Sequence, residues 1–290
     1  MDRLPLIDRL IKDQSQWWRK GFVSAFVAAL GPKDIGRLLG TYAWPSIELR
    51  DALLKSVLED LRYGLSRQAH LRMVSQLMRN LKRAAPSKRQ SGAYILRQLF
   101  PFLPVRRKHA VLGLFLQSPY PSFRQRAYAL ARRYPRPSYW PLVRDTWRRF
   151  GDVDAIKLML RTAPPAFVEA NLPELADAAR GTDLLRLLVL RTQDPNNSLL
   201  EELRTTDEIS YVYALARKGR RLENVEASSM FARHATDERV GILIWSFGKM
   251  GLWQALEHAL SQSETMRKAH HRRLFSHLDP DLWPQAGITE

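Results

Sequence analysis

The segment FLQSPYPSFRQRAYALARRY, residues 115–134, contains the apolar end of one helix, a break at Ser118-Pro119 and the start of a second helix. Helical periodicity recurs in almost every other segment, whereas the alternation of apolar and polar residues that marks a β-strand is hard to find. The predicted helices are about 10 to 18 residues long, and short stretches with Pro, Gly or Ser separate them. The sequence therefore predicts an all-α fold.

From residue 87 onward the predicted helices form pairs. The pairs are 87–103 with 105–117, 121–134 with 138–150, 206–218 with 225–235, and 237–249 with 252–261. Each pair occupies about 30 to 35 residues, which is the size of one unit in a helical-repeat protein. Further helices are expected at residues 4–11, 15–30, 33–42, 46–64, 66–84, 153–162, 182–191, 198–204 and 264–277, and helical turns are expected at residues 166–180.

Internal similarity supports a repeat. The tripeptide Thr-Asp-Glu occurs at residues 206–208 and again at 236–238, each time before an apolar helix that ends near a basic residue and a glycine. Thr or Asp caps the first N–H groups of a helix, acidic residues in the first turn interact favourably with the positive end of the helix dipole, and glycine commonly ends a helix. Thr182-Asp183 is a shorter copy.

Residues 115–134 resemble the second half of a HEAT repeat, the armadillo-type helical hairpin. That pattern has Asp-Pro or a similar pair after an apolar helix, followed by Val-Arg and Ala-x-x-Leu. The matching residues are Ser118-Pro119, Phe123-Arg124, Ala127 and Leu130. The resemblance extends over residues 87–261. It implies an α-solenoid whose concave face binds an extended partner, and it implies no particular activity.

The chain is accordingly expected to have three regions. Residues 1–86 form an N-terminal helical region with a basic face, residues 87–262 form the HEAT-like repeats, and residues 263–290 form a capping helix and tail.

The distribution of charge is uneven. Residues 61–144 contain 18 lysines and arginines and no aspartate or glutamate, although the chain has 29 acidic residues among 290. Residues 1–150 carry 29 basic and 9 acidic side chains, whereas residues 151–290 carry 17 and 20. Such a stretch favours a nucleic-acid partner, because acidic side chains would repel phosphates. Arginines outnumber lysines 35 to 11, which suits bidentate phosphate contacts, although codon usage gives the same bias.

The helix predicted at residues 66–84 has two different faces. Its apolar side chains at 71, 74, 77, 78 and 81 fall on one side, and Arg72, Arg79 and Arg83 project from the other. Helices with a solvated surface usually mix glutamates with their basic residues. We therefore expect this helix to pack with one face and to present the basic face to a ligand.

The predicted nucleic-acid-binding residues lie on successive helices. They are Arg72, Arg79, Lys82, Arg83, Lys88, Arg89, Arg106, Arg107, Lys108, Arg124, Arg126, Arg132, Arg133, Arg136, Arg144 and Arg148. Because equivalent positions of stacked repeats line up, these clusters are expected to form a basic stripe that makes sequence-independent phosphate contacts. The sequence leaves open whether the clusters share one face and whether the ligand is DNA or RNA.

Aromatic residues are interleaved with these clusters. They are Tyr94, Tyr120, Tyr128, Tyr134, Tyr139 and Trp140. Such rings stack on unpaired bases or pack in the core. Core packing is the interpretation that we favour for Trp140 and Trp147.

Two alternative functions stay open. The first is a protein-interaction scaffold whose basic face binds an acidic protein. In the nucleic-acid-binding interpretation itself, the neutral C-terminal third, which contains Trp245, Trp253 and Trp283, docks a protein partner or caps the array. The second is an alkylpurine DNA glycosylase, a HEAT-like class that uses an aspartate beside aromatic residues. Asp145, two residues before Trp147, is its candidate catalytic residue. Asp145 is also expected to pair with Arg148 or Arg149 of its own helix.

Other chemistry has little support. None of the common nucleotide-binding, zinc-protease or serine-hydrolase motifs is present, so no cofactor is predicted. The spacing between Arg272 and His277 is that of some helical ribonucleases, but chance accounts for it in a chain with this many arginines. Histidines at 258, 270, 271 and 277 lack the paired spacing of metal ligands, so no metal site is predicted.

The chain has no cysteine, which fits a reducing cytoplasm. Its first residues include acids and no apolar signal segment, and the longest apolar run, residues 22–30, is shorter than the roughly 20 residues that span a bilayer. We therefore expect a soluble cytoplasmic protein without a membrane segment.

Overall fold

The structure is a computed structural model, and it describes residues 20–193 and 198–262. Within these ranges it contains seventeen α-helices, two 3-10 helices and no β-strand. The prediction of an all-α fold is confirmed. The chain divides into two compact units, unit 1 (Met1–Asp154) and unit 2 (Ala155–Glu290). The division at residues 86 and 262 stays a prediction.

Unit 1 contains eight α-helices and two 3-10 helices in its described part. They are α2 (Lys20–Ala28), α3 (Pro32–Gly40), α4 (Ile47–Arg62), α5 (Arg67–Leu81), α6 (Pro86–Leu99), η1 (Phe100–Phe102), α7 (Val105–Leu116), α8 (Pro121–Arg133), η2 (Pro137–Tyr139) and α9 (Trp140–Phe150).

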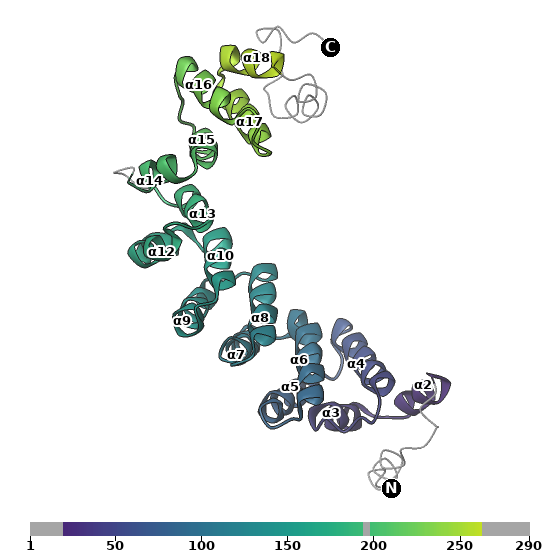
Figure 1. The fold of residues 1–290 in the computed structure, drawn as a ribbon. Helices are drawn as coiled ribbons and strands as arrows, with labels where there is room; N and C mark the ends of the chain where they lie inside the picture. Colours follow the sequence, from purple (N-terminus) through teal and green to yellow (C-terminus); the bar gives the residue numbers. More distant parts are fainter. Residues whose placement is uncertain (1–19, 194–197, 263–290) are drawn as a thin grey trace. The chain divides into compact units, whose positions relative to one another are not determined.

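These helices pack in two rows. In one row α2 packs on α4 and α6 packs on α8, and in the other α3 packs on α5 and α7 packs on α9. Chain neighbours join the rows, because α4 packs on α5, α5 on α6 and α7 on α8. Figure 1 shows α6 beside α8, and α7 beside α9. In unit 1, α2, α3, α6 and α7 thus each pack on the helix after next, and several neighbouring helices also pack on each other.

The faces of α5 show why this packing forms. Met73, Val74, Leu77 and Leu81 are buried, and the arginines predicted on the opposite side are exposed. An apolar stripe at this spacing buries one side of a helix. The predicted two-faced character of this helix is confirmed.

Glycine permits the close approach of α6 to the α3–α4 connection. A Cβ atom at Gly92 would lie 2.2 Å from the Tyr42 hydroxyl oxygen. That hydroxyl donates a hydrogen bond to the Leu77 carbonyl oxygen at 3.1 Å. Tyr42 therefore links α5 and α6, and only glycine leaves space for its ring.

Unit 2 is built from nine further helices in its described part, the first of which begins at the end of unit 1. They are α10 (Val153–Thr162), α11 (Pro165–Ala170), α12 (Leu172–Ala179), α13 (Leu184–Arg191), α14 (Ser198–Thr206), α15 (Glu208–Arg217), α16 (Asn224–His234), α17 (Val240–Met250) and α18 (Trp253–Ser261). Here too α13 packs on α15, α15 on α17 and α16 on α18.

The two Thr-Asp-Glu copies begin their helices differently. Asp207 is the N-cap of α15, and its carboxylate accepts a hydrogen bond from the Ser210 backbone N–H at 3.2 Å. In the second copy the Asp237 carboxylate accepts from the Arg239 backbone N–H at 2.7 Å, and α17 begins only at Val240. The Arg239 guanidinium also donates to Asp207 at 3.0 Å. The copies are therefore joined by an ion pair.

Most other helix predictions agree with the structure within a few residues. The helical turns predicted at residues 166–180 form two short helices, α11 and α12, which meet at Asn171. Pro173 stands in the first turn of α12 and cannot donate a backbone hydrogen bond to the preceding helix. The helices predicted at residues 4–11 and 264–277, Trp283 and the Arg272–His277 pair lie outside the described residues.

Candidate nucleic-acid interface

The connections between the helices of unit 1 lie at two alternating edges. Edge A contains the α3–α4, α5–α6, α7–α8 and α9–α10 connections, and edge B contains the α4–α5, α6–α7 and α8–α9 connections. Side chains link successive connections of each edge: Arg89 donates to the Tyr120 hydroxyl at 2.7 Å on edge A, and the Phe100 and Tyr134 ring centroids are 5.7 Å apart on edge B.

One helix length separates the two edges. The helices between them, α6, α7 and α8, have 14, 12 and 13 residues, which corresponds to about 20 Å at 1.5 Å per residue. The predicted basic clusters are therefore distributed over both edges and the helix faces between them.

Six predicted cations gather on two successive connections of edge B. We call them the edge-B cluster: Arg106, Arg107, Lys108, Arg132, Arg133 and Arg136. The first three stand in the first turn of α7, and the others lie at the end of α8 and before η2. All six are exposed or half-buried, and none forms an ion pair with a carboxylate of the described residues. This concentration of uncompensated positive charge is suited to a polyanion.

The cations of edge A are used partly within the fold. The Lys88 ammonium donates to the Trp44 carbonyl oxygen and lies 4.7 Å from the Trp44 ring centroid, and burial lowers its pKa. The Arg89 guanidinium donates to the Ala84 carbonyl oxygen at 3.0 Å and lies 5.1 Å from the Tyr120 ring centroid. These side chains hold successive connections together. Arg79, Lys82 and Arg83 of the same edge are exposed.

Arg124, a predicted phosphate ligand, is enclosed in the fold. It is 5% exposed, and its guanidinium donates to the Asp152 carboxylate at 2.5 and 2.9 Å and to the Ser118 and Pro119 carbonyl oxygens at 3.0 Å. Its Cζ lies 4.1 Å from the Phe150 ring centroid. Four of its five N–H donors are therefore used inside the fold and the side chain is buried, so Arg124 is not accessible to a phosphate.

The partners of Arg124 confirm its structural role. The guanidinium hydrogen bonds lower the pKa of Asp152 against the opposing effect of burial. The same hydrogen bonds raise the pKa of Arg124. Tyr128 completes the group, because its hydroxyl donates to Asp152 at 2.7 Å. The group therefore ties α8 to the connection after α9.

Two cations meet on the row that contains α6 and α8. Arg126 of α8 is half-buried, and its pKa is lowered first by burial and second by the positive charge of Arg97 on α6. Arg97 is exposed and is not among the predicted nucleic-acid-binding residues. Its position within the acid-free residues 61–144 is the sequence feature that would have added it to them.

The candidate catalytic residue Asp145 is exposed on α9. Its carboxylate lies 3.3 Å from Arg144 and 3.9 Å from Arg148, and its side chain is 61% exposed. The prediction that it pairs with an arginine of its own helix is confirmed. These pairs also reduce the positive charge that Arg144 and Arg148 offer to a ligand.

The buried aromatic residues are not available for base stacking. Tyr128, Tyr139 and Trp140 are at most 6% exposed, so the core interpretation is confirmed for Trp140. Trp147 is half-buried. The remaining tyrosines carry cations on their rings: the Arg50 guanidinium lies 4.9 Å from the Tyr94 ring centroid, Arg89 covers Tyr120, and Lys108 and Arg133 lie near Tyr134.

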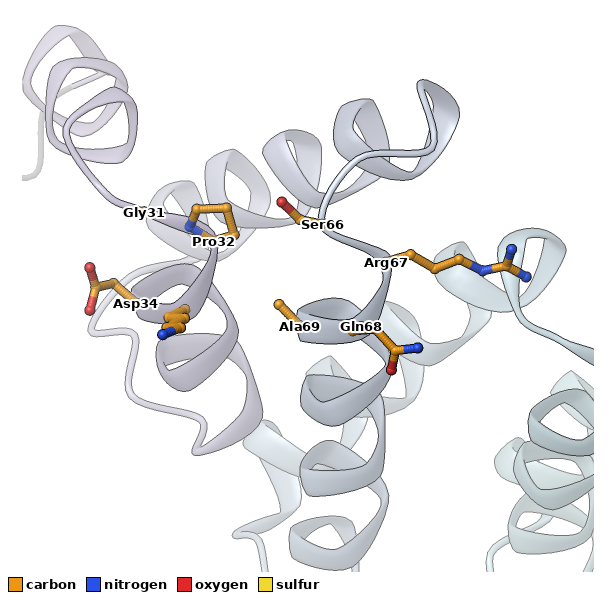
Figure 2. A pocket seen from close by; sticks show the side chains of 8 residues that line it. Gly31, Pro32, Asp34, Ser66, Arg67, Gln68 and Ala69 are labelled. Atoms are coloured by element: carbon orange, nitrogen blue, oxygen red, sulfur yellow. The ribbon is translucent and has the colours of Figure 1, made fainter.

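An open pocket of about 670 Å³ lies where the N-terminal ends of α3 and α5 meet. Figure 2 shows its lining of small side chains, with Asp34 on one side and Arg67 extending away from the others. Lys33 also lines it. The lining has one carboxylate, Asp34, together with the Lys33 ammonium and the Ser66 hydroxyl, and it has no histidine.

Metal ligands do not assemble in the described part of the chain, where no three His, Asp or Glu side chains come together. His258 is exposed on α18, and the other three C-terminal histidines lie outside the described residues. No described helix has the length and apolar character needed to cross a membrane.

Comparison with protein-family models, with curated proteins and with solved structures gives no match.

Proposed function

We propose that unit 1 binds nucleic acid through phosphate contacts that do not depend on base sequence. The observation that supports this most strongly is the edge-B cluster, six cations without a carboxylate partner among the described residues. Exposed Arg72, Arg79, Lys82 and Arg83 on α5 and edge A add to the same field.

The aromatic residues argue against base stacking as the main contact. Proteins that hold single strands combine a basic groove with open aromatic faces. Of the three exposed tyrosines among the described residues, Tyr94 and Tyr120 each have a guanidinium about 5 Å from the ring centroid, and only Tyr63, at the end of α4, is left as an open ring. Contacts to the sugar-phosphate backbone therefore supply the affinity in this proposal.

The proposed repeat architecture supports the binding role. We propose that each unit is a HEAT-like α-solenoid, because in both units several helices pack on the helix after next, as stacked hairpins do. In such a stack the connections of neighbouring hairpins lie side by side, which places the basic residues of different hairpins on one edge. The cytoplasmic location and the docking of a protein partner by unit 2 stay predictions.

Fluorescence anisotropy with labelled single-stranded and duplex DNA and RNA tests the proposal. If six phosphates are contacted, the logarithm of the affinity falls with the logarithm of salt concentration with a slope of about −5, which is about a thousandfold between 50 and 200 mM salt. The test variant changes Arg106, Arg107 and Arg132 to Gln. The matched control changes Arg161, Arg217 and Lys249 to Gln, three exposed cations of unit 2, and it has the same net charge.

The proposal requires binding at low salt that the test variant loses and the control keeps. Absence of binding to all four nucleic acids at about 50 mM salt would reject it. The acidic-protein alternative would then be tested with polyglutamate, a carboxylate polymer without phosphates, in place of nucleic acid.

A further inference from the structure

The connection between α4 and α5 presents an open aromatic ring. Tyr63, the residue after α4, is 74% exposed, and no ring or cation of the described residues lies against it. Leu65, two residues later, is 55% exposed. An accessible aromatic face at the tip of a connection is the feature that stacking on a nucleic-acid base requires.

Hydrogen bonds hold this tip in one conformation. The Leu65 backbone N–H donates to the Asp60 carbonyl oxygen at 2.7 Å, and Gly64 between them adopts a φ of 73°, which glycine permits. The Asp60 carboxylate lies 2.9 Å from Nε2 of His70, which is buried on α5. The tip is therefore tied to both helices, and Tyr63 is presented without the entropic cost of ordering a flexible loop.

The charges around the tip are basic. Arg62 and Arg67 flank it, both are exposed, and neither forms an ion pair with a carboxylate of the described residues. The acidic side chains that precede the tip are already used, because Glu59 lies 3.9 Å from Lys55 and Asp60 pairs with the buried histidine. Two guanidinium groups beside an open ring complement the phosphates on either side of a base.

The tip belongs to the edge that carries the edge-B cluster. Near the start of α4 the Arg50 guanidinium donates to the hydroxyl of Ser91, near the start of α6, at 3.1 Å. The two helices therefore run in the same direction, from edge A to edge B. They have 16 and 14 residues, so they are similar in length. The first ends at Tyr63, and the second leads to Arg106 and Arg107 of the cluster.

We propose that Tyr63 stacks on an unpaired base of a nucleic acid whose phosphates lie along edge B. The ligand is a single strand or the single-stranded part of a partly paired molecule, because bases inside a duplex are stacked on each other and do not offer a free face. Cations occupy three successive connections of this edge, whereas its described part has one exposed aromatic ring. That combination fits many phosphate contacts with one base contact. The inference rests on the proposed function and adds a base contact to it.

Fluorescence anisotropy with the full chain and three ligands tests the stacking contact. The ligands are a single strand, a strand of the same length in which every base is removed, and a duplex. We expect Tyr63→Ala to weaken single-strand binding about fivefold to a hundredfold, the range for loss of one stacked base, and to leave the other two affinities unchanged. Tyr63→Trp keeps a stacking face and should keep the single-strand affinity. Equal single-strand binding by Tyr63→Ala and wild type, or equal weakening for all three ligands, would overturn the inference.

Ile47→Ala is the matched control. Ile47 is 62% exposed at the other end of α4, on edge A, so this change truncates an apolar side chain away from the tip and should leave all three affinities unchanged. Because Tyr63 is mostly exposed, neither variant should shift the unfolding midpoint. A loss of single-strand affinity in Ile47→Ala as large as that in Tyr63→Ala would remove the tip from the contact.

The three ligands separate this inference from the proposed function. Binding of all three with no effect of Tyr63→Ala rejects the stacking contact alone. Absence of binding to all three rejects the proposed function and the stacking contact with it. Vesicles of phosphatidylglycerol are then the second arm, because a tyrosine and a leucine between arginines also suit an anionic lipid surface. Vesicle binding that Tyr63→Ala loses would assign the tip to a lipid surface and overturn the base as its partner.

Discussion

Replacing Arg124 with Met tests whether this arginine stabilises the fold or binds phosphate. The substitution keeps a long apolar stem and removes the guanidinium. Asp152 then loses hydrogen bonds of 2.5 and 2.9 Å and keeps only the 2.7 Å bond from Tyr128. The carbonyl oxygens of Ser118 and Pro119 lose a donor as well.

The expected loss of stability follows from the burial of the pair. Removing one partner of a buried ion pair costs about 3–5 kcal/mol. The Asp152 side chain is 20% exposed, so water partly compensates its charge and the lower end, about 3 kcal/mol, applies. For a unit of this size each kcal/mol shifts the midpoint by about 2–4 °C, which gives a decrease of about 6–12 °C.

Calorimetry of the full chain measures this decrease, and Arg132→Met on the same helix is the control because Arg132 is exposed. We expect Arg124→Met to lower the midpoint and to leave the nucleic-acid affinity of the folded protein nearly unchanged, with the reverse for Arg132→Met. An unchanged midpoint in Arg124→Met together with weakened binding would refute the reasoning.

Two further predictions concern unit 1. The pKa of Asp152 is lower in the folded state than in the unfolded state. Its contribution to stability is therefore complete above the unfolded pKa of about 3.9 and is lost as the pH falls through the folded pKa. Urea unfolding from pH 7 to acid should show a smaller pH dependence of stability in Asp152→Asn than in wild type, and identical profiles would contradict this role of Asp152. Gly92→Ala should destabilise the folded protein by about 1–3 kcal/mol, because the added Cβ would collide with Tyr42. Gly113→Ala lies in a helix with open space around the position, so it should be neutral or stabilise the protein by about 0.5–1 kcal/mol. A destabilised Gly113→Ala with an unaffected Gly92→Ala, in the same unfolding measurements, would contradict both predictions.

The helices were predictable because their signals are local. Apolar spacing on α5 and the breaks at Gly and Pro residues are visible in a single sequence, and α10 was predicted at its observed bounds. The exceptions depend on single residues, such as Pro173 at the start of α12 and Asp237 in the turn before α17.

The basic composition of the candidate site was predictable from the sequence, but the positions of its individual side chains were not. The sequence indicated that residues 61–144 are basic, but it could not separate Arg124 from Arg132, since their difference depends on Asp152 in another connection. The division between the two edges follows from the alternating directions of consecutive helices, and the pair of Arg124 and Asp152 joins α8 to the connection after α9. Such contacts depend on tertiary structure and have no pattern in the sequence.

The salt dependence of duplex binding tests the central claim most directly. The logarithmic slope is measured from about 50 to about 300 mM salt for wild type, for the variant with Arg106, Arg107 and Arg132 changed to Gln, and for the unit 2 control with the same charge. If edge B contacts the backbone, loss of three phosphate contacts reduces the slope by about 2.7 in the first variant and leaves it unchanged in the control. Equal slopes in all three proteins would contradict the assignment of edge B as the phosphate-binding surface.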